Sequence, residues 1–276
     1  MAYYLMLNNF KHYIVKKSVG ATAISIRKPM LEKFHIPIPC PDNPEKSLEI
    51  QQEIVRVLDE LTSLTNQLTT ELETERQNRK KQFEFFREHL FSFEEGKAEW
   101  KTLGSECDIF TGGEAPSNCI KGILPNDKFV YPIYGNGMEV YGYTDSYRID
   151  KDAVTISSIG ANTGNVYYRN AFFTPIIRLK VVIPKKDNLI SKFIFHYLNT
   201  IKINSKSSSV PNMNASDVKK IKIPIPSLAE QERIVKFLDQ FDATHTAIEE
   251  EITKEIKLRT QQYEYYREKL LSFPQN

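Results

Sequence analysis

The sequence lacks several features that mark specialised classes of protein. Its 276 residues contain no apolar run approaching the roughly 20 residues that span a bilayer, so we expect no membrane partner. The segment Met1–Phe10 lacks the basic and long apolar regions of a secretory signal. Only three cysteines occur (Cys40, Cys107 and Cys119) and none forms a CxxC pair, which argues against disulfides and structural zinc. These absences favour a cytoplasmic protein.

Catalytic signatures are missing as well. Gly160–Asn165 is no Walker A loop because no Gly-Lys-Ser/Thr follows it, and Gly135–Gly137 lacks the helix and distant acid of a dinucleotide fold. The sequence also contains no Asn/Asp-Pro-Pro-aromatic loop of an adenine methyltransferase, no GxSxG elbow and no HxxxH pair. We therefore expect a binding or scaffolding protein that carries no cofactor or metal of its own.

A long internal repeat sets the architecture. Ser47–Asp59 matches Ser227–Asp239, and Gln82–Phe93 matches Gln262–Phe273, both at an offset of 180 residues. No proline or glycine interrupts either copy, and apolar residues recur at spacings of three, four and seven. Each copy therefore predicts one rigid helix, about 70 Å long at roughly 1.5 Å per residue.

The apolar stripes of these two helices are expected to bury each other in an antiparallel coiled coil, because neither can bury its stripe alone. The expected seam consists of Leu58, Leu61, Leu68, Leu72, Phe83, Phe86, Leu238, Phe241, Ile248, Ile252, Tyr263 and Tyr266. Ser47 and Ser227 are the expected N-caps, and only Ser227, with Glu230 three residues on, fits a capping box. The alternative is a pair of long core helices with solvated acidic faces.

The repeat extends upstream of the helices. Phe34–Pro39 aligns with Ile221–Pro226 at an offset of 187, and the insert Cys40–Lys46 accounts for the seven-residue difference. Further upstream, Tyr4-Leu5 resembles Tyr197-Leu198. The start of the chain therefore reads as the C-terminal part of a domain whose complete copy follows the first helix.

The complete copy is rich in predicted strands. Its β-prone segments are Phe129–Tyr134, Ala153–Ser157, Asn165–Arg169 and Ile176–Ile183, with glycine turns between them and a short helix near Leu189–Leu198. The predicted class is α+β, with one strand-rich domain and two long helices forming an antiparallel coiled coil. The predicted order is a domain remnant (1–46), the first long helix (47–99), the complete domain (100–226) and the second long helix (227–276).

Positive and negative charge alternate along the chain, although the net charge is only +2. Residues 1–46 carry seven Lys/Arg and three Asp/Glu, and residues 101–226 carry sixteen and ten. The two helix repeats, 47–93 and 227–273, each have a net charge of −3. Because local charge decides the binding of a polyanion, the basic domain predicts a nucleic-acid partner.

Three polar clusters in the basic domain are candidates for contact with DNA. Phosphates are bound by cations, and base edges are read by amides, hydroxyls and arginine on exposed turns. The candidates are Tyr134, Asn136, Gly137 and Tyr141; Ser157, Ser158, Asn162 and Thr163 at a glycine turn; and Lys206, Ser207, Ser208, Asn212 and Asn214 in a polar segment. For each cluster taken alone, a solvated polar loop is the alternative.

The order of several motifs points to a known family. Trp100–Gly104, Tyr131–Gly137, Gly142–Thr144 and Ile159–Gly164 occur in that order, and Ile223–Pro226 then precedes a helix that starts Ser-Leu-x-x-Gln-x-x-Ile-Val-x-x-Leu-Asp. In this order and with this duplication, the chain resembles the specificity (S) subunit of type I restriction-modification systems. The resemblance extends over essentially the whole sequence.

The resemblance implies a function without chemistry of its own. Such a subunit carries two target recognition domains, and each reads one half of a split site in double-stranded DNA. Its paired helices set the gap between the half-sites and hold methyltransferase (M) subunits, which bring S-adenosylmethionine. Restriction (R) subunits join this complex to cut DNA.

The chain departs from the family pattern in its first recognition domain, of which only residues 1–46 are present. One reading is a half-type subunit that pairs with a second S chain. The other is a truncated, inactive fragment. Outside this family, the competing interpretation is a coiled-coil interaction scaffold that does not bind DNA, and a salt-dependent affinity for duplex DNA would distinguish the two classes.

Overall fold

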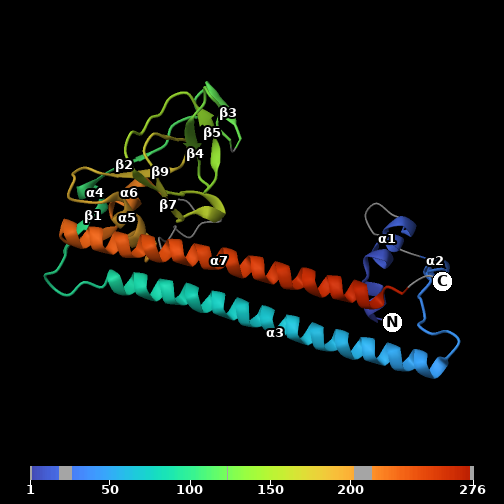
Figure 1. The fold of residues 1–276 in the computed structure, drawn as a ribbon. Helices are drawn as coiled ribbons and strands as arrows, with labels where there is room; N and C mark the ends of the chain where they lie inside the picture. The colour runs from blue at the N-terminus through green and yellow to red at the C-terminus, as the bar shows by residue number, and fades with distance from the viewer. Residues whose placement is uncertain (1, 19–26, 123, 202–212, 274–276) are drawn as a thin grey trace. The chain divides into compact units, whose positions relative to one another are not determined.

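The computed structural model describes residues 2–18, 27–122, 124–201 and 213–273. The chain forms two compact units, the first built from Met1–Arg79 with Thr246–Asn276 and the second from Lys80–His245 (Figure 1). Two long helices, α3 (Pro44–Leu90) and α7 (Leu228–Leu271), each contribute residues to both units. The fold is therefore mixed, with long helices and a strand-rich part, as the sequence predicts.

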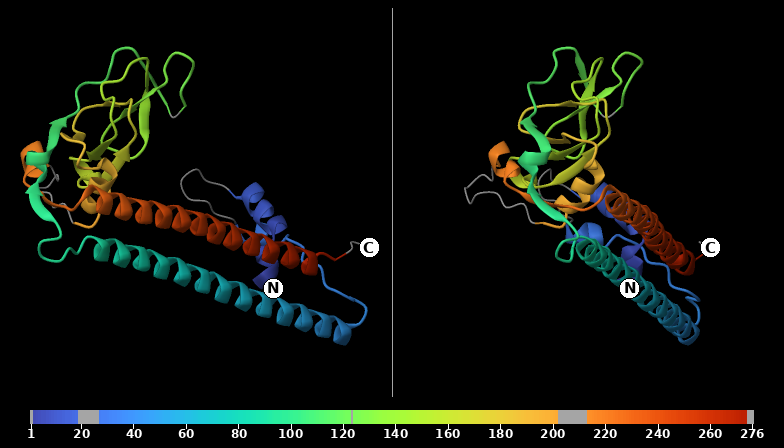
Figure 2. Two further views of the ribbon diagram at one scale, coloured as in Figure 1. Left: turned by 60° about the vertical axis from the view of Figure 1, so that its left-hand side comes forward. Right: turned by 90° about the vertical axis from the view of Figure 1, so that its left-hand side faces the viewer.

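Among its described residues, the second unit contains three β-sheets. Figure 2 shows this strand-rich unit from two further sides. One is antiparallel, in the order β2 (Cys107–Thr111), β9 (Lys180–Pro184), β6 (Ala153–Ile156) and β7 (Val166–Arg169). Another has the order β3 (Cys119–Lys121), β5 (Val140–Thr144), β4 (Tyr131–Tyr134) and β8 (Thr174–Pro175), with β4 and β8 parallel. The third pairs β1 (Glu99–Thr102) with β10 (Lys222–Ile225) in antiparallel register.

The core of the second unit lies between its strands and its helices. All four residues of β6 are buried, which suits a run of small and β-branched side chains covered on both faces. Val154 and Val182 of the first sheet share this core with Phe193 of α5 (Ser191–Leu198) and with Ile234 and Leu238 of α7. The short helices α4 (Leu103–Glu106) and α6 (Ala215–Lys219) add Leu103 and Val218.

Polar contacts fix the start of α7 to the same core. Gln231 is fully buried, and its Oε1 accepts the N–H of Ile190 at 3.0 Å, while its Nε2 donates to the carbonyls of Asn188 (2.9 Å) and Pro226 (3.1 Å). Each of these bonds satisfies a group that burial would otherwise leave unpaired. The glutamine of the repeated helix motif is thus the residue that attaches this helix to its domain.

A second polar contact joins α5 to α7. The buried His196 lies 3.1 Å from Asp239, and Lys192 donates to the other carboxylate oxygen at 2.6 Å. Burial lowers the pKa of His196 by more than the hydrogen bond to Asp239 raises it. The imidazole is therefore neutral near pH 7 and pairs with Asp239 as a hydrogen-bonding group.

The long helices pair in both units. In the second unit, Phe83 stacks on Phe241 with ring centroids 5.2 Å apart. In the first unit, Thr62 donates to the Tyr263 hydroxyl at 3.1 Å, and Arg76 Nε lies 2.6 Å from Glu249 Oε2. Within the first unit, the later residue of α3 meets the earlier residue of α7, so the helices are antiparallel there.

The burial of the predicted seam residues falls into three classes. Leu58 and Leu238 are fully buried, and Ile252 nearly so. Those of intermediate burial are Leu61, Leu68, Leu72, Phe83, Phe86, Phe241, Ile248 and Tyr263. Tyr266 does not belong to the buried seam, because it is 41% exposed. The buried residue beside it is Arg267, whose guanidinium lies over the Tyr263 ring at 5.3 Å.

The helix ends differ from the predicted ones. Helix α3 begins at Pro44, and Asn43 rather than Ser47 is its cap, since Asn43 Oδ1 accepts the Lys46 N–H at 3.1 Å. The helix ends at Leu90 rather than at residue 99, because Phe91 turns into the core of the second unit. Ser227 accepts the Glu230 N–H at 3.4 Å, as expected of a cap.

The predicted capping box at this end is only half formed. The Glu230 carboxylate binds Arg233 through two bonds, of 2.6 and 2.8 Å. The charged Arg233 guanidinium competes for the Glu230 carboxylate with the neutral Ser227 backbone N–H, which a capping box would use. The sequence pattern therefore identifies the cap and not the partner of the glutamate.

The N-terminal segment is helical and packs within the first unit. It forms η1 (Ala2–Met6), α1 (Asn8–Lys17) and α2 (Lys28–Leu31). Leu7 is buried against Leu58 of α3 and Leu271 of α7, and the Tyr3 hydroxyl donates to Asp59 at 2.5 Å. Across the described residues, every helix is too short or too polar to cross a membrane.

We expect Leu58→Ala to lower the free energy of unfolding by about 2–5 kcal/mol, because it leaves a cavity beside Leu7 and Leu271. The matched control is Leu64→Ala, which changes a residue that is 63% exposed on the same helix and should cost less than about 0.5 kcal/mol. Urea unfolding of both variants measures the difference. Equal losses would contradict the packing of the first unit.

Candidate nucleic-acid interface

Two of the predicted clusters lie on loops of the second unit that meet each other and a third loop, which contains no predicted residue. The first loop begins at the last residue of β4 (residues 134–138). The second joins β6 to β7 (157–165) and contains the 3-10 turn η2 (Gly160–Asn162), and the third precedes β9 (176–179). We call these three segments the loop cluster. The hydrogen bond from the Ile176 N–H to the Tyr134 carbonyl, at 2.9 Å, ties the third loop to the first.

Asn136 holds the first two loops together. Its Nδ2 donates to the Ile159 carbonyl at 2.6 Å, its Oδ1 accepts the Ser158 N–H at 2.7 Å, and its own carbonyl accepts the Ser157 hydroxyl at 2.7 Å. Three bonds of this kind stabilise one loop geometry by about 0.5–1.5 kcal/mol each. The side-chain amide predicted to contact DNA thus bonds inside the protein.

Ser157 and Ser158 are buried beneath the loop cluster. Ser158 Oγ donates to the Arg178 carbonyl, and its own carbonyl accepts the Met213 N–H at 2.9 Å. The two hydroxyls therefore hold the loops and are covered from solvent. Met213 directly precedes Asn214, the last predicted residue of the third polar cluster. The bond to Met213 therefore joins that end of the cluster to the second loop.

The remaining residues of that third segment have mixed outcomes. Lys206, Ser207, Ser208 and Asn212 lie outside the described residues. Asn214 is exposed, but its side chain caps α6 in a reciprocal capping box with Asp217. Capping accounts for Asn214 without any contact to DNA.

Arg169 supports the loop cluster from its buried side. No sequence pattern identified it as a site residue. The residue is buried in β7, and its guanidinium donates to the carbonyls of Gly137 (3.0 Å) and Met138 (2.9 Å). The same group stacks on Tyr134, 3.8 Å from the ring centroid, and on Tyr167 at 4.9 Å. Burial lowers the pKa of Arg169 from its ordinary value. Tyr134 and Gly137 are thereby held in place by this cation.

Other residues of the cluster face outward. Asn162 is exposed at the end of η2, and Thr163 beside it is half-buried and donates to the Gly160 carbonyl at 2.7 Å. Arg178 is exposed and adopts a left-handed backbone, with φ of 73°. A non-glycine residue in that region is strained, and such strain concentrates at functional sites. Tyr141 is exposed on β5, with Lys121 Nζ 5.7 Å from its ring centroid.

Arg178 is the cation that the three segments of the loop cluster carry. The charge of Arg178 acts on the buried Lys180, whose pKa is lowered first by burial and then by this neighbouring cation. The loop between β5 and β6 carries the exposed cations Arg148 and Lys151 together with the exposed Asp145, Asp150 and Asp152. No sequence signal distinguishes the outward Arg178 from the inward Arg169, since both occur in strand-prone stretches.

The arrangement suits binding rather than catalysis. Within the described ranges, no three His, Cys, Asp or Glu residues are grouped to hold a metal ion. The three cysteines are free, and burial raises the pKa of Cys107 to about 12, so its thiol is not a nucleophile near neutral pH. The cluster presents a surface that is held by internal hydrogen bonds and carries amide, hydroxyl and guanidinium groups.

Comparison with known proteins identifies the class. The family described as type I restriction modification DNA specificity domain matches residues 1–75 and 97–258, and the chain belongs to this family. Its members are specificity subunits, which are distinct from the catalytic methyltransferase and restriction subunits. The absence of catalytic motifs from the sequence agrees with this assignment.

Individual relatives support it. The chain is 38% identical to the specificity subunit of the type I restriction enzyme EcoR124I/EcoR124II of Escherichia coli, over 87% of this chain and 63% of that protein. It is 34% identical to the EcoprrI specificity subunit of E. coli, over 85% and 59%. The chain thus spans about 60% of the length of these relatives.

A solved structure has the same fold. A chain from a study of complex assembly and conformational transition in a type I restriction-modification system superimposes with a TM-score of 0.79. The match covers 98% of this chain and 69% of that one at 17% sequence identity. The recognition domain with its long helices is therefore an established fold.

We expect Arg169→Leu to destabilise the second unit by about 1–3 kcal/mol, because it leaves the Gly137 and Met138 carbonyls without their donor. Arg169→Lys should recover only part of the loss, since an ammonium cannot span both carbonyls and stack on Tyr134. Urea unfolding gives the free energies, and hydrogen exchange at residues 137–139 reports the loop. Wild-type exchange in Arg169→Leu would refute the bracing role.

Proposed function

We propose that the second unit is a target recognition domain that reads one half of a bipartite site in double-stranded DNA. The observation that carries the proposal is the convergence of three loops around Ser158, which present an amide and a guanidinium at the surface. Their inward groups are satisfied, which leaves Asn162 and Arg178 outward. Arginine and asparagine are the side chains best suited to guanine and adenine edges in the major groove.

The assembly around this domain follows from the family. We propose that the helix pair docks M subunits, which supply S-adenosylmethionine and methylate adenine, and that R subunits join this complex in the cytoplasm. The chain itself performs no chemistry. The one complete recognition domain described accounts for one half of a bipartite site.

The alternative within the family is an inactive fragment, and the alternative outside it is a scaffold that does not bind DNA. The acidic helix repeats, each with a net charge of −3, would suit a scaffold. The sixteen Lys/Arg against ten Asp/Glu in residues 101–226 favour DNA instead. A titration with duplex DNA at several salt concentrations distinguishes them.

We expect log K for duplex DNA to fall linearly with log salt. Arg178→Ala should weaken binding about tenfold and make that slope shallower by about one, because one phosphate or base contact is lost. The control is Arg233→Ala, which removes the same charge from an exposed arginine on α7 that is paired with Glu230. Identical affinities for the two variants would remove Arg178 from the interface, and salt-independent binding would favour the scaffold.

Mapping of adenine methylation tests whether the chain selects a particular DNA sequence. In cells that hold this chain, its cognate M subunit and no other complete S subunit, we expect adenine methylation at a bipartite motif. Asn162→Ala should relax one half of that motif, because each lost base contact costs about 1–3 kcal/mol of discrimination. A palindromic motif would indicate two copies of the chain, and an asymmetric one a different second chain. No methylation despite M binding would identify an inactive fragment.

A further inference from the structure

Two buried cations lie in the sheet formed by β2, β9, β6 and β7. Arg169 of β7 and Lys180 of β9 are each 7% exposed. Arg169 Nε lies 3.4 Å from the hydroxyl of Thr155, which pairs with Val181 of β9. Because successive residues of a strand point to opposite faces, Lys180 lies on the other face of the sheet from Val181. The two cations therefore have separate surroundings.

Lys180 has far fewer partners than Arg169. Its ammonium carries three N–H donors, and among the described residues its one hydrogen-bond partner is the Thr111 hydroxyl, at 3.0 Å. Arg169 instead donates to two carbonyls and stacks on two rings. A buried cation with a single bond to a neutral hydroxyl recovers little of the cost of leaving water.

The charge of Lys180 also lacks a counter-ion in the protein. Within the described ranges, neither Lys180 nor the neighbouring Arg178 lies within salt-bridge distance of a carboxylate. The residues outside those ranges contain no Asp or Glu. Burial lowers the pKa of Lys180, and the charge of Arg178 lowers it further, because both disfavour the ammonium. Two neighbouring cations without a counter-charge are the arrangement that an anion would stabilise.

This charge lies at the border of the loop cluster. Lys180 is the first residue of β9 and pairs with Thr111, the last residue of β2, which is exposed. The next residue is Gly112, where a Cβ would lie 2.4 Å from the Ile176 carbonyl oxygen, so only glycine lets the end of β2 approach the third loop this closely. The ammonium is thus bonded to an exposed hydroxyl and lies beside the exposed Arg178, both of which an anion can reach.

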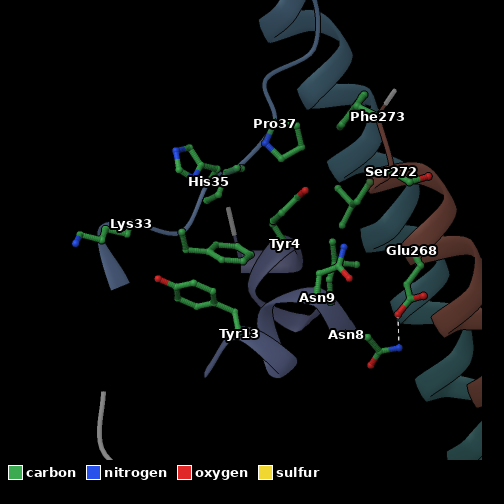
Figure 3. Close-up of a pocket in the computed structure, with 14 residues that line it drawn as sticks. Tyr4, Asn8, Asn9, Tyr13, Lys33, His35, Pro37, Glu268, Ser272 and Phe273 are labelled. Carbon is green, nitrogen blue, oxygen red and sulfur yellow. Dashed lines mark hydrogen bonds between the residues drawn. The ribbon is translucent and has the colours of Figure 1, made fainter. Parts of the chain in front are cut away.

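A cavity of about 570 Å³ in the first unit shows the opposite case. Its lining includes Lys33, His35 and Glu268 (Figure 3). The Glu268 carboxylate accepts a hydrogen bond from Asn8, and the side chains of Lys33 and His35 are exposed to solvent. These ionisable groups are bonded or solvated and need no ligand, whereas Lys180 is both buried and unneutralised.

We propose that Lys180 and Thr111 bind a phosphate of the DNA backbone, with the Lys180 ammonium donating to a phosphate oxygen. A phosphodiester supplies the negative charge and the acceptors that this ammonium lacks. The proposal rests on the proposed binding of DNA by the second unit, and it adds a contact that is independent of base sequence. The adjacent Arg178 strengthens the local positive charge and is left free to reach a base edge.

Lys180→Met removes the charge and keeps a long side chain. Binding of the full chain to duplex DNA should weaken about tenfold, and the slope of log K against log salt should become shallower by about one. The loss should be equal on two duplexes of unrelated sequence, because a phosphate contact carries no sequence information. The matched control is Lys185→Met, about 17 Å along the same strand direction at roughly 3.4 Å per residue, where Nζ bonds to the Gly104 carbonyl. Its affinity should stay within about twofold of wild type.

Stability measurements distinguish a phosphate contact from a structural role. An apolar side chain in place of a buried, unneutralised charge is neutral or stabilising, so the urea midpoint of Lys180→Met without DNA should equal or exceed that of wild type. Inorganic phosphate should raise the melting temperature of wild type more than that of the variant, since only wild type gains from binding. A lower midpoint with unchanged DNA affinity would show a structural lysine and overturn the proposal.

Thr111→Val is the second variant, which serves if Lys180→Met does not fold. It keeps the shape of the side chain, removes the hydroxyl that holds Lys180, and should weaken DNA binding about threefold. A loss on only one of the two duplexes would indicate base reading and would overturn the phosphate contact. If wild type binds DNA and Lys180→Met binds it equally, the proposed function stands and this proposal fails. If wild type responds to inorganic phosphate through Lys180 but does not bind duplex DNA, the anion site stands and the proposed function fails.

Discussion

The structure depends on the burial of the first turns of α7 in the core of the second unit. A long amphipathic helix is not stable by itself in water, and most of its stability comes from packing of its apolar face. Ile234 and Leu238 supply that packing, and the buried Gln231 satisfies backbone groups on either side of it. In the first copy the equivalent Gln51 is exposed and bonds only to Ser47 on its own helix. Both repeats bury the equivalent leucine, Leu58 or Leu238, and the second repeat adds the buried polar anchor of Gln231.

In the recognition domain, the residues that hold the loops in place differ from the residues that are proposed to contact DNA. Asn136, Ser157 and Ser158 are polar, but their hydrogen bonds are made within the protein, and the buried Arg169 braces the same loops. A buried polar network of this kind is stable only when its members are satisfied, and it then fixes one loop geometry. The proposed readout of DNA would fall to the residues that this network holds at the surface. The proposed contacts through Asn162 and Arg178 depend on it.

Much of the fold could be predicted from the sequence, because the helix repeats are long and their periodicity is strong. Four of the described strands (β4, β6, β7 and β9) were also predicted, while β1, β2, β3, β5, β8 and β10 were not. In β5, Gly142 weakens the strand pattern, and it is required because a Cβ there would lie 2.1 Å from the Ile120 carbonyl oxygen. The candidate site was harder to predict than the fold. Residue type alone cannot distinguish the inward Asn136 from the outward Asn162, and a buried arginine such as Arg169 has no local signal.

The internal bonding of Asn136 has a consequence for how such a domain can change over evolutionary time. Substitutions at Asn162 or Arg178 alter what the surface presents and leave the hydrogen bonds beneath it intact. Substitutions at Asn136 or Arg169 would instead disturb all three loops together. Mutational tolerance is therefore concentrated where specificity is expected to reside, so a lineage could acquire a new target without passing through an unfolded intermediate.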